Sequence, residues 1–393
     1  MHLEPDNRIH GVRRRLSKVL YIDYLLVLIV SAALGAHVYW LWPPPEHRLD
    51  SCDCEPPGQG FGPEDRYLDL KPFPTIGRGF NNQFHEVLFY TYLASATGRQ
   101  YVYRPFGSSK WTQERLNLSN VIDPTPSLAQ HLVCAEKHRV MCPEEEVTNL
   151  TVAASGEGMI GRAITIINQH RETRCVRLNT WVLEWNFLSK EPAILLYWEQ
   201  YSAVVLQQIR WTSEVAGAAQ TFLERTSGGP YIALHLRRGD YTNHCGLLHQ
   251  QRMKFAFWNQ LPNLPDPLHI DFDTPTSKEH LQTRCLPTSE SIISRLESIL
   301  ESSYKPRGVV PGLYVMHTGA ESDVEALRDH FGRRFASYND SNDRVKSSTR
   351  VLVDVEIGRR SDIFIGNGWS TVTSQVVQMR ISDGVPYNQT RFW

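Results

Sequence analysis

The amino-acid sequence predicts an α/β protein with parallel strands, and two observations support this class. Short apolar runs such as Tyr231–Leu236 and Leu313–His317 alternate along the chain with stretches that carry one apolar face, such as Glu290–Ser303. Strands separated by helices in this order are typical of parallel βαβ layers. The chain of 393 residues is also longer than a single core usually allows, because such cores stop growing near ~250–300 residues. We therefore expect two domains.

The individual elements follow from apolar periodicity and from the positions of glycine and proline. In chain order they are helix Asn82–Ala96, strand Gln100–Tyr103, helix Tyr197–Arg225, strand Tyr231–Leu236, helix Glu290–Ser303, strand Leu313–His317, helix Glu321–Phe331, strand Asp362–Ile365 and helix Ser370–Met379. Pro262–Pro275 holds four prolines and is expected to be a surface loop. We place the domain boundary at Gly228-Gly229-Pro230, between residues 67–227 and residues 228–393.

Composition excludes one class of partner. The 41 Lys and Arg residues nearly balance the 42 Asp and Glu residues, which leaves a net charge of -1. Domains that bind nucleic acids usually carry an excess of positive charge, so we expect no nucleic-acid partner.

Residues 19–42 are expected to form a transmembrane helix. The run Tyr24–Trp42 holds 19 residues without a charge, apart from a partial one on His37. At about 1.5 Å per residue, this run approaches the ~30 Å thickness of a bilayer core. Basic residues precede it and prolines follow it, which predicts a cytoplasmic tail (1–18) and a lumenal stem (43–66). A cleaved signal peptide is the alternative, although no small-residue cleavage pattern follows the run.

The rest of the chain has features of a lumenal protein. All seven cysteines lie C-terminal of the predicted span, which suits an oxidising compartment. Plausible bridges join Cys134 to Cys142 and Cys245 to Cys285. Asn-x-Ser/Thr sequons begin at Asn117, Asn149, Asn339 and Asn388. We expect a single-pass type II protein of the ER or Golgi membrane with a lumenal catalytic part.

The first of three candidate ligand-binding segments is residues 77–83, Gly-Arg-Gly-Phe-Asn-Asn-Gln. Glycines let a ligand approach the backbone closely, and the free N–H groups of the helix that follows attract anions. The segment lacks the spacing of a dinucleotide fingerprint and the Gly-Lys-Ser/Thr of a P-loop. Taken alone, it is equally well explained as an ordinary helix start capped by Asn.

The second segment is residues 235–241, His-Leu-Arg-Arg-Gly-Asp-Tyr, at the end of a predicted strand. Alternation along the strand places His235 and Arg237 on one face. The guanidinium fork of Arg237 could bind a diphosphate and stabilise the charge that develops on a leaving nucleotide. Arg238 and Asp240 are expected to form a surface ion pair worth under about 1 kcal/mol.

The third segment is residues 364–372, Phe-Ile-Gly-Asn-Gly-Trp-Ser-Thr-Val. Ser370 and Thr371 open the last predicted helix, where hydroxyl and N–H groups can hold a phosphate. A plain N-cap is the alternative. In open α/β sheets ligands bind beyond the carboxyl ends of the strands, where the last two segments are expected to lie.

In this order, the three segments resemble the GDP-fucose protein O-fucosyltransferase superfamily, a group of inverting enzymes with the GT-B fold. The similarity runs from about Gly77 to Arg380. It includes residues 209–215 (Ile-Arg-Trp-Thr-Ser-Glu-Val), which are similar to a family helix of the Leu-Arg-Phe-Ser type, and residues 362–367, which match the late strand. The resemblance implies two Rossmann-like domains facing a cleft, GDP-fucose as the donor substrate, and no metal or other cofactor.

The resemblance also implies roles for individual residues. Arg237 and Asn82 are the expected catalytic residues, and Arg237 would contact the diphosphate and the glycosidic oxygen. The expected contacts of the remaining residues are the diphosphate and fucose for Gly79, Phe80, Asn81 and Asn82, the nucleoside for His235, guanine for Asp354, and phosphate and base for Ser370, Thr371 and Val372. The assignment of Asp354 rests on the resemblance alone.

The general base is where the sequence departs from part of the family. Some relatives carry a Glu beside the glycine of the first segment, where this chain has Arg78. Others have an Asn-Gln pair, matched here by Asn82-Gln83, and work without a strong base. We therefore name no base and expect stabilisation of the leaving GDP to matter most.

Two other functions stay open at this point. The chain could be a catalytically silent lumenal adaptor that binds a glycan or protein, or it could use another GDP-sugar. Arg237 and Ser370-Thr371 disfavour the adaptor. Asp271-Phe272-Asp273 has the metal-binding pattern of GT-A transferases, but it lies in the predicted loop, so we expect no metal there. The acceptor, a protein Ser/Thr hydroxyl or a glycan hydroxyl, is not identified by the sequence.

Overall fold

A computed structural model of the chain describes residues 64–71, 79–107, 116–153, 158–183, 192–226, 229–239, 241–318, 321–338 and 347–393. The predicted cytoplasmic tail, transmembrane segment and most of the stem lie outside these ranges. Among the residues that are described, no helix is long and apolar enough to cross a bilayer.

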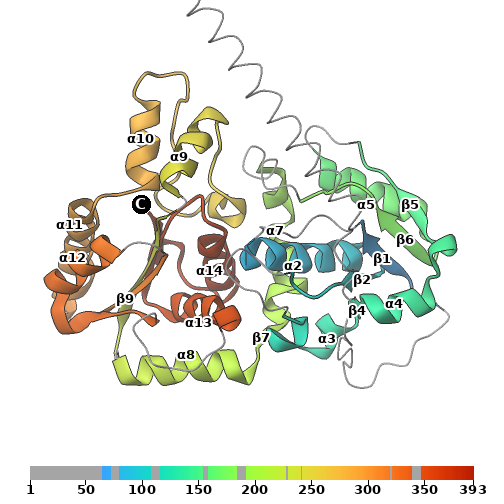
Figure 1. Cartoon of the computed structure of the whole chain (residues 1–393), viewed down its shortest axis with the longest axis horizontal. Helices are drawn as coiled ribbons and strands as arrows, with labels where there is room; N and C mark the ends of the chain where they lie inside the picture. The colour runs from blue at the N-terminus through green and yellow to red at the C-terminus, as the bar shows by residue number, and fades with distance from the viewer. Residues whose placement is uncertain are drawn as a thin grey trace, which may run out of the picture. The chain divides into compact units, whose positions relative to one another are not determined.

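The N-terminal half is built on a five-stranded sheet in the order β4-β2-β1-β6-β5. All four strand pairings are parallel. The strands are β1 (Tyr67–Leu70), β2 (Gln100–Tyr103), β4 (Leu132–Cys134), β5 (Thr148–Leu150) and β6 (Cys175–Leu178), and the main helices are α2 (Phe80–Ala96), α4 (Ala135–Met141) and α5 (Met159–Gln169). Helix α2 packs against β2, and Figure 1 shows it between this sheet and the C-terminal half.

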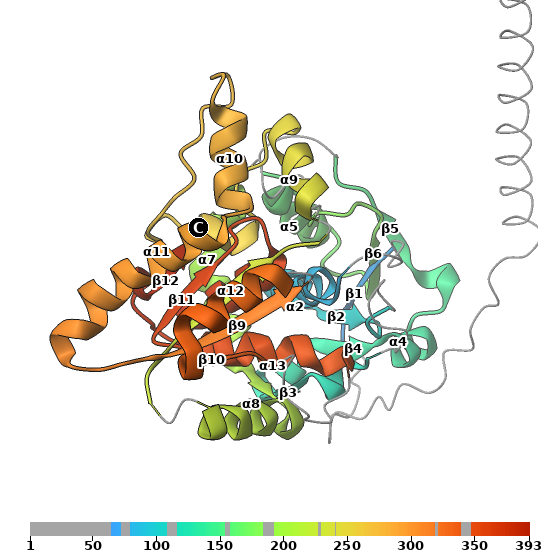
Figure 2. The same ribbon diagram turned by 60° about the vertical axis from the view of Figure 1, so that its left-hand side comes forward.

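The C-terminal half is built on a second five-stranded sheet, in the order β10-β9-β8-β11-β12, and it is also parallel throughout. Its strands are β8 (Tyr231–Arg237), β9 (Gly312–Thr318), β10 (Phe335–Ala336), β11 (Ile363–Gly366) and β12 (Thr390–Phe392). Its helices are α9 (Tyr241–Gln250), α10 (Ser277–Cys285), α11 (Ser289–Ile299), α12 (Glu321–Phe331), α13 (Ser347–Arg360) and α14 (Thr371–Ser382). Helices α9 and α10 project from this half (Figures 1 and 2). The predicted α/β class with parallel strands is confirmed.

Helices α2 and α14 form the junction between the halves. Both are buried on almost every side: twelve of the seventeen residues of α2 and nine of the twelve residues of α14 are buried. The one-sided apolar pattern expected for the first of these helices is therefore too simple. A helix with a sheet behind it and a second domain in front of it has little surface left for water.

The predicted helix Tyr197–Arg225 is wrong as a single element. The chain forms α7 (Trp198–Val204), then the short strand β7 (Ile209–Trp211), and then α8 (Ser213–Thr226). β7 pairs in antiparallel fashion with β3 (Ile122–Pro124), so strand pairing across the fold overrides the local helical pattern. The similarity to a family helix over residues 209–215 therefore begins in a strand.

Helix α8 precedes Gly228-Gly229-Pro230 in the chain but packs against α13 of the C-terminal half (Figure 1). Phe222 on α8 lies edge-on to Tyr314 of β9 and to Tyr338, with ring centroids 5.3 Å apart in both pairs. The chain that precedes the predicted boundary therefore also contributes a helix to the packing of the C-terminal half.

Disulfide bonds are present in both halves. Cys245 and Cys285 are bonded, as expected, and they join the ends of the α9–α10 region. The predicted Cys134–Cys142 pair is wrong, because Cys142 is bonded to Cys175 at the start of β6, with 5.9 Å between their Cα atoms. Cys134 is also disulfide-bonded.

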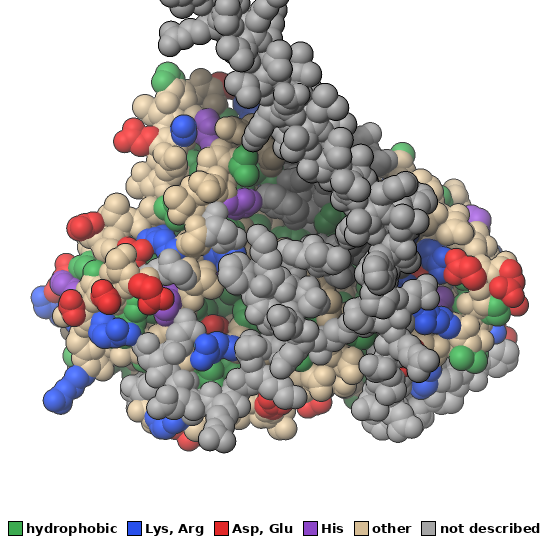
Figure 3. Space-filling view, viewed as in Figure 1, with side chains coloured by type: hydrophobic (Ala, Val, Ile, Leu, Met, Phe, Trp, Pro, Cys, Tyr) green, Lys and Arg blue, Asp and Glu red, His purple; other side chains and the backbone are tan. Residues whose placement is uncertain are grey.

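Acidic and basic side chains alternate over the described part of the face seen in Figure 3. Red and blue groups lie next to one another at both sides of the molecule and do not form a broad field of one sign there.

Candidate functional site

The second and third segments meet at the carboxyl edge of the C-terminal sheet. Arg237, the last residue of β8, lies opposite Thr318, the last residue of β9. On the other side of β8, Ile365 of β11 lies opposite Leu234. Because parallel strands run in one direction, the residues that follow each strand collect at one edge of the sheet.

His235 connects this strand end directly to α14. Its Nδ1 atom lies 2.8 Å from the hydroxyl oxygen of Thr373, and the side chain is 3% exposed. Burial, with a smaller effect of the nearby Arg237, lowers the pKa of His235 to about 3. The imidazole is therefore neutral and already bonded within the protein. The nucleoside contact predicted for it stays a prediction.

Arg237 is partly exposed at the end of β8. Its guanidinium lies 5.1 Å from the ring centroid of Tyr241, the first residue of α9, and Nη1 lies 3.5 Å from the hydroxyl of Thr318. The face of an aromatic ring attracts a cation, so the Tyr241 ring helps to orient the guanidinium at the strand end. Arg237 thus keeps a charge that can act on an anion.

Arg238 has a different environment from the one expected. Its Nε atom donates to Asp323 at 2.5 Å, and it also donates to the carbonyl of Pro287. The side chain is only 12% exposed, so Arg238 is not a loose surface residue. Arg238 therefore joins the end of β8 to α12 through the Asp323 carboxylate, and it is also held by the Pro287 carbonyl. Asp240, its expected partner, lies outside the described residues.

The glycines of the third segment serve packing. A Cβ atom on Gly366 would lie 2.4 Å from Cγ2 of Thr373, and one on Gly368 would lie 2.3 Å from the ring of Phe255. No real side chain tolerates such contacts. These two glycines allow the chain to pass closely between β11 and the start of α14.

Ser370 is the N-cap of α14, as the alternative of a simple helix cap predicts. Its side-chain oxygen accepts a hydrogen bond from the backbone N–H of Val372 at 3.3 Å. Thr371 and Val372 form the partly exposed first turn of the helix. The hydroxyl and N–H groups of such a turn can bind an anion, so capping and phosphate binding are compatible here.

The first segment is described from Gly79 onward, since Gly77 and Arg78 lie outside the described residues. Gly79 is the N-cap of α2 and has no side chain to cap it, and a Cβ atom built there would meet nothing within 4 Å. The Oδ1 atoms of Asn81 and Asn82 are buried without a hydrogen-bond partner. Open space beside the backbone and acceptors without a partner suit this segment to binding a ligand that donates hydrogen bonds.

Two neighbours in this segment have structural contacts. Phe80 packs on Phe106, with ring centroids 4.8 Å apart. Gln83 accepts a hydrogen bond from the backbone N–H of Gly107 at 2.8 Å and donates to its carbonyl at 3.4 Å. Of the Asn82-Gln83 pair, the Gln side chain therefore holds the chain that follows β2.

His85 joins the first segment to the third and was missed by sequence reasoning. Its Nε2 atom lies 3.1 Å from the carbonyl oxygen of Thr371, and its ring stacks on Phe257 at 4.8 Å with an interplanar angle of 8°. A signal was available: His85 follows Asn81 by four residues, which places both on one face of α2.

The segment around Phe257 was also missed. Asn259 donates from Nδ2 to the carbonyls of Gly368 (2.9 Å) and Ser370 (3.3 Å) and so holds the loop before α14. Phe257 has a φ of 49°, in the left-handed region that costs a bulky residue on the order of 1–3 kcal/mol. Strain of this kind persists only where the surroundings enforce it.

Asp354 lies apart from the other candidates. It is on α13, where the Tyr314 hydroxyl donates to its carboxylate, and burial raises the pKa of Asp354 to about 7. Tyr314 lies four residues before Thr318 on β9, about 13 Å at ~3.3 Å per residue. The structure thus brings His235, Arg237, Ser370 and Thr371 to one strand edge and leaves Asp354 farther along the sheet.

Asp271 and Asp273 both have hydrogen-bond partners within the protein. Arg252 donates to both oxygens of Asp273, at 2.7 and 2.8 Å, and Asp271 accepts from the backbone N–H of Asp273. In the described part of the chain, no cluster of three or more His, Cys, Asp or Glu side chains could hold a metal ion.

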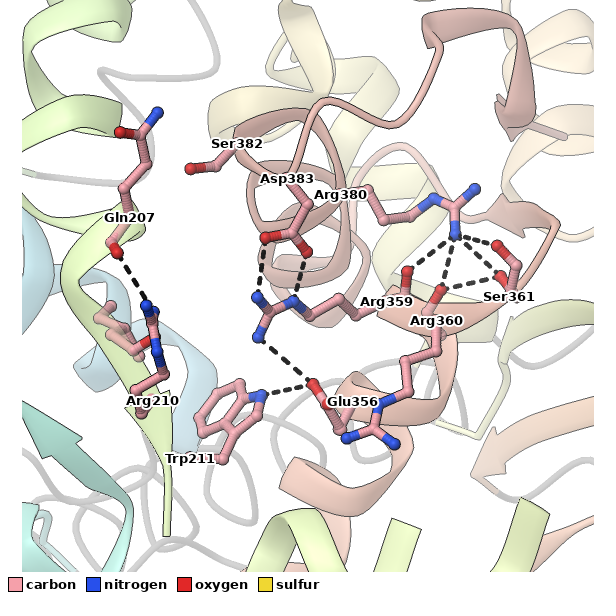
Figure 4. Close-up of polar contacts among 12 residues, drawn as sticks. Gln207, Arg210, Trp211, Glu356, Arg359, Arg360, Ser361, Arg380, Ser382 and Asp383 are labelled. Carbon is pink, nitrogen blue, oxygen red and sulfur yellow. Dashed lines mark hydrogen bonds and ion pairs between the residues drawn. The ribbon is translucent and has the colours of Figure 1, made fainter. Parts of the chain in front are cut away.

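The far end of α14 has a different polar network (Figure 4). Glu356 accepts from the Trp211 indole at 2.6 Å, and Arg359 binds Asp383 through two nitrogens at 2.5 and 2.8 Å. Buried Arg380 donates to backbone carbonyls that include those of Gly358 and Ser361. A surface cavity of about 530 Å³ borders these residues. Because the charges are paired with one another, we interpret this region as structural.

Comparisons with known proteins agree with this geometry. Residues 79–382 match the family described as GDP-fucose protein O-fucosyltransferase. A crystal structure of POFUT1 in complex with GDP superimposes with a TM-score of 0.55 at 16% identity, over 84% of this chain and 99% of that one. A POFUT1 complex with GDP-fucose gives 0.53 at 15% identity, over 85% and 99%. No curated protein sequence matches the chain. The likeness to the solved structures confirms the fold, and the resemblance found in the sequence is confirmed.

Proposed function

The chain belongs to the GDP-fucose protein O-fucosyltransferase family and is a fucosyltransferase, and we propose that it transfers fucose from GDP-fucose to a hydroxyl group with inversion. The acceptor hydroxyl would belong to a Ser or Thr of a protein or to a glycan. This proposal names the donor and the stereochemistry of the reaction, and it leaves the acceptor as one of two classes.

One observation carries the proposal: residues within or directly beside all three candidate segments meet at the start of α14. His85, four residues after Asn81, contacts Thr371, and His235 of the second segment contacts Thr373. A ligand at this point would have Arg237 on one side and the first turn of α2 on the other. The family match and the POFUT1 structures, whose ligands are GDP and GDP-fucose, support the identity of that ligand.

The charges suit a departing diphosphate. Arg237 and the N–H groups at the start of α14 would stabilise the negative charge that develops on GDP as the glycosidic bond breaks. Asp354 accepts a hydrogen bond from Tyr314, which lies about 13 Å before Thr318 along β9, and the nucleoside of GDP would extend in that direction. Its carboxylate would accept hydrogen bonds from the N–H groups of guanine when it is ionised.

The sugar would lie against α2. The unsatisfied oxygens of Asn81 and Asn82 are acceptors, and the hydroxyl groups of fucose are donors. No side chain described at this place is a strong base, so the proposed reaction depends on charge stabilisation at the leaving group more than on removal of the acceptor proton.

A thermal-shift titration of the full-length chain tests the proposal. GDP, GDP-fucose, UDP and CMP are compared, each with and without EDTA, since a ligand that binds only the folded state raises its stability. We expect GDP and GDP-fucose alone to raise the melting temperature, and EDTA to have no effect. A shift with UDP that requires metal would overturn the proposal. A shift with GDP but no release of fucose to any acceptor would favour the silent adaptor.

We further propose that the catalytic part lies in the lumen of the secretory pathway, anchored through residues 19–42. The buried disulfides Cys142–Cys175 and Cys245–Cys285 support this location, because such bonds persist in oxidising compartments. In sealed microsomes, an epitope at the C-terminus should resist added protease until detergent is present. Cleavage of that epitope without detergent would contradict the proposal.

A further inference from the structure

His85 is the side chain through which α2 reaches the start of α14. It is 2% exposed, and it approaches the C-terminal half through two contacts: the Nε2 atom with the Thr371 carbonyl, and the ring with Phe257. Both partners belong to the C-terminal half, whereas His85 belongs to the N-terminal half. The residue therefore crosses the junction at the end of α14 where the donor phosphates would bind.

The hydrogen bond determines the tautomer of His85. A carbonyl oxygen only accepts, so the Nε2 atom must carry the hydrogen and donate it. Burial lowers the pKa of His85 to about 4, which keeps the ring neutral. Its Nδ1 atom then has a lone pair and no hydrogen-bond partner. A buried acceptor without a donor is unfavourable, and a phenylalanine at this place would avoid that cost.

The partner of the ring carries a second unfavourable feature. Phe257 has left-handed backbone geometry. It lies between Ala256 and Asn259, which both bind the third segment. The N–H of Ala256 donates to the Gly368 carbonyl at 2.8 Å, and the Asn259 amide donates to Gly368 and Ser370. The ring of the strained Phe257 thus stacks on His85, while its neighbours in the chain are hydrogen-bonded to the loop that ends at the N-cap of α14.

We propose that His85 is a positioning residue, which fixes the phosphate-binding end of α14 relative to the sugar-binding end of α2. His85 lies one turn along α2 from Asn81, and its N–H donates to the carbonyl of Thr371, the first residue of α14. The start of α2 and the start of α14 are therefore held in a fixed position relative to each other. This inference rests on the proposed function, because the donor is what needs both ends at once. It explains why a histidine with an unsatisfied nitrogen stands where an apolar ring would pack.

A matched control exists in the same junction. The Tyr201 hydroxyl donates to Oε1 of Gln378 at 2.9 Å, which also joins the two halves, but two turns farther along α14. The Tyr201 ring stacks on Trp258 at 4.7 Å, so Tyr201→Phe removes one hydrogen bond and keeps the packing. His85→Phe does the same at the donor end, and His85→Gln restores an N–H donor near the position of Nε2.

The test uses the full-length chain and these three variants. GDP affinity is measured by titration, and the hydrogen exchange of backbone amides is followed over residues 371–378. We expect His85→Phe to weaken GDP binding at least tenfold and to accelerate exchange at the start of α14. His85→Gln should stay within threefold of the wild type in both measurements, and so should Tyr201→Phe.

Two results would overturn the inference. One is a His85→Phe protein with normal GDP affinity and normal exchange. The other is a Tyr201→Phe protein with the same losses as His85→Phe, which would assign the effect to the junction as a whole. If the wild type binds no GDP, the proposed function fails instead, and the exchange measurement still decides whether His85 holds α14.

Discussion

The Nε2 atom of His85 lies 3.1 Å from the carbonyl oxygen of Thr371, although 286 positions separate the two residues in the chain. This contact joins α2, which begins within the first candidate segment, to α14, which begins at the end of the third. The two helices are buried against each other, so the elements proposed to bind the donor belong to one packed junction. Changes at this junction should therefore affect binding as well as stability.

Arg237→Ala is expected to abolish fucose transfer while the protein stays folded. Arg237 is partly exposed at the end of β8, so its replacement should mainly remove charge stabilisation at the leaving group. Turnover of GDP-fucose and the melting temperature are measured together. Arg237→Lys is the control, because it keeps the charge and loses the planar fork. An Arg237→Ala protein that turns over at the normal rate contradicts the proposed mechanism.

Stability should fall as the pH decreases below about 6.5, the ordinary pKa of histidine. The folded pKa values of His85 and His235 are about 4 and about 3. The unfolded chain therefore binds protons that the folded chain excludes, and stability present at neutral pH is lost in acid. From pH 7 to pH 5.5 the two residues together should lower the free energy of unfolding by about 2 kcal/mol.

Urea unfolding at the two pH values measures this effect. The glutamine in His85→Gln does not titrate, so only His235 of the pair remains in this variant. The loss of stability that the pair causes between pH 7 and pH 5.5 should therefore be about half as large as in the wild type. An unchanged acid sensitivity in His85→Gln would show that folding does not lower the pKa of His85.

Affinity for GDP-fucose should rise from pH 6 to pH 8. Burial raises the pKa of Asp354 to about 7, and only the ionised carboxylate accepts hydrogen bonds from the N–H groups of guanine. Binding to the ionised form alone predicts about tenfold weaker affinity at pH 6 than at pH 8. Titration with GDP-fucose checks this, since its diphosphate does not titrate in this range. Asp354→Asn should bind weakly at both pH values, and a retained pH dependence in this variant would exclude Asp354 as its source.

Loss of the Cys245–Cys285 disulfide should reduce both stability and donor binding. The bond spans 40 residues, and such cross-links contribute about 2–4 kcal/mol. Asn367 of the third segment donates from Nδ2 to the Cys285 carbonyl at 2.7 Å, which links the bond to the start of α14. Denaturant unfolding and GDP titration of the double serine variant measure the two effects.

Removal of the Cys142–Cys175 bond provides the comparison, because it spans 33 residues in the N-terminal half. It should cost a similar free energy of unfolding and leave GDP affinity near the wild-type value. Equal losses of affinity in the two double variants would mean that the effect is general destabilisation.

Much of the fold could be predicted from local patterns. The strand Gln100–Tyr103 and the helix Glu321–Phe331 have the predicted bounds, because apolar runs and amphipathic periods survive in the folded chain. The helix expected over Tyr197–Arg225 could not be corrected locally. Its strand Ile209–Trp211 exists only because Ile122–Pro124 lies beside it, and that pairing partner is far away in the sequence.

The site divides in the same way. The sequence by itself determined which three segments are the candidates for the site, since Arg237 at a strand end and Ser370-Thr371 at a helix start are local signals of charge, hydroxyls and turn geometry. Only the tertiary structure decided what each side chain does there: Ser370 caps its helix, Arg238 pairs with Asp323, and the neutral ring of His85 holds the Thr371 carbonyl. The physical reason is that burial and hydrogen-bond partners come from the packing of distant segments, which no local pattern encodes.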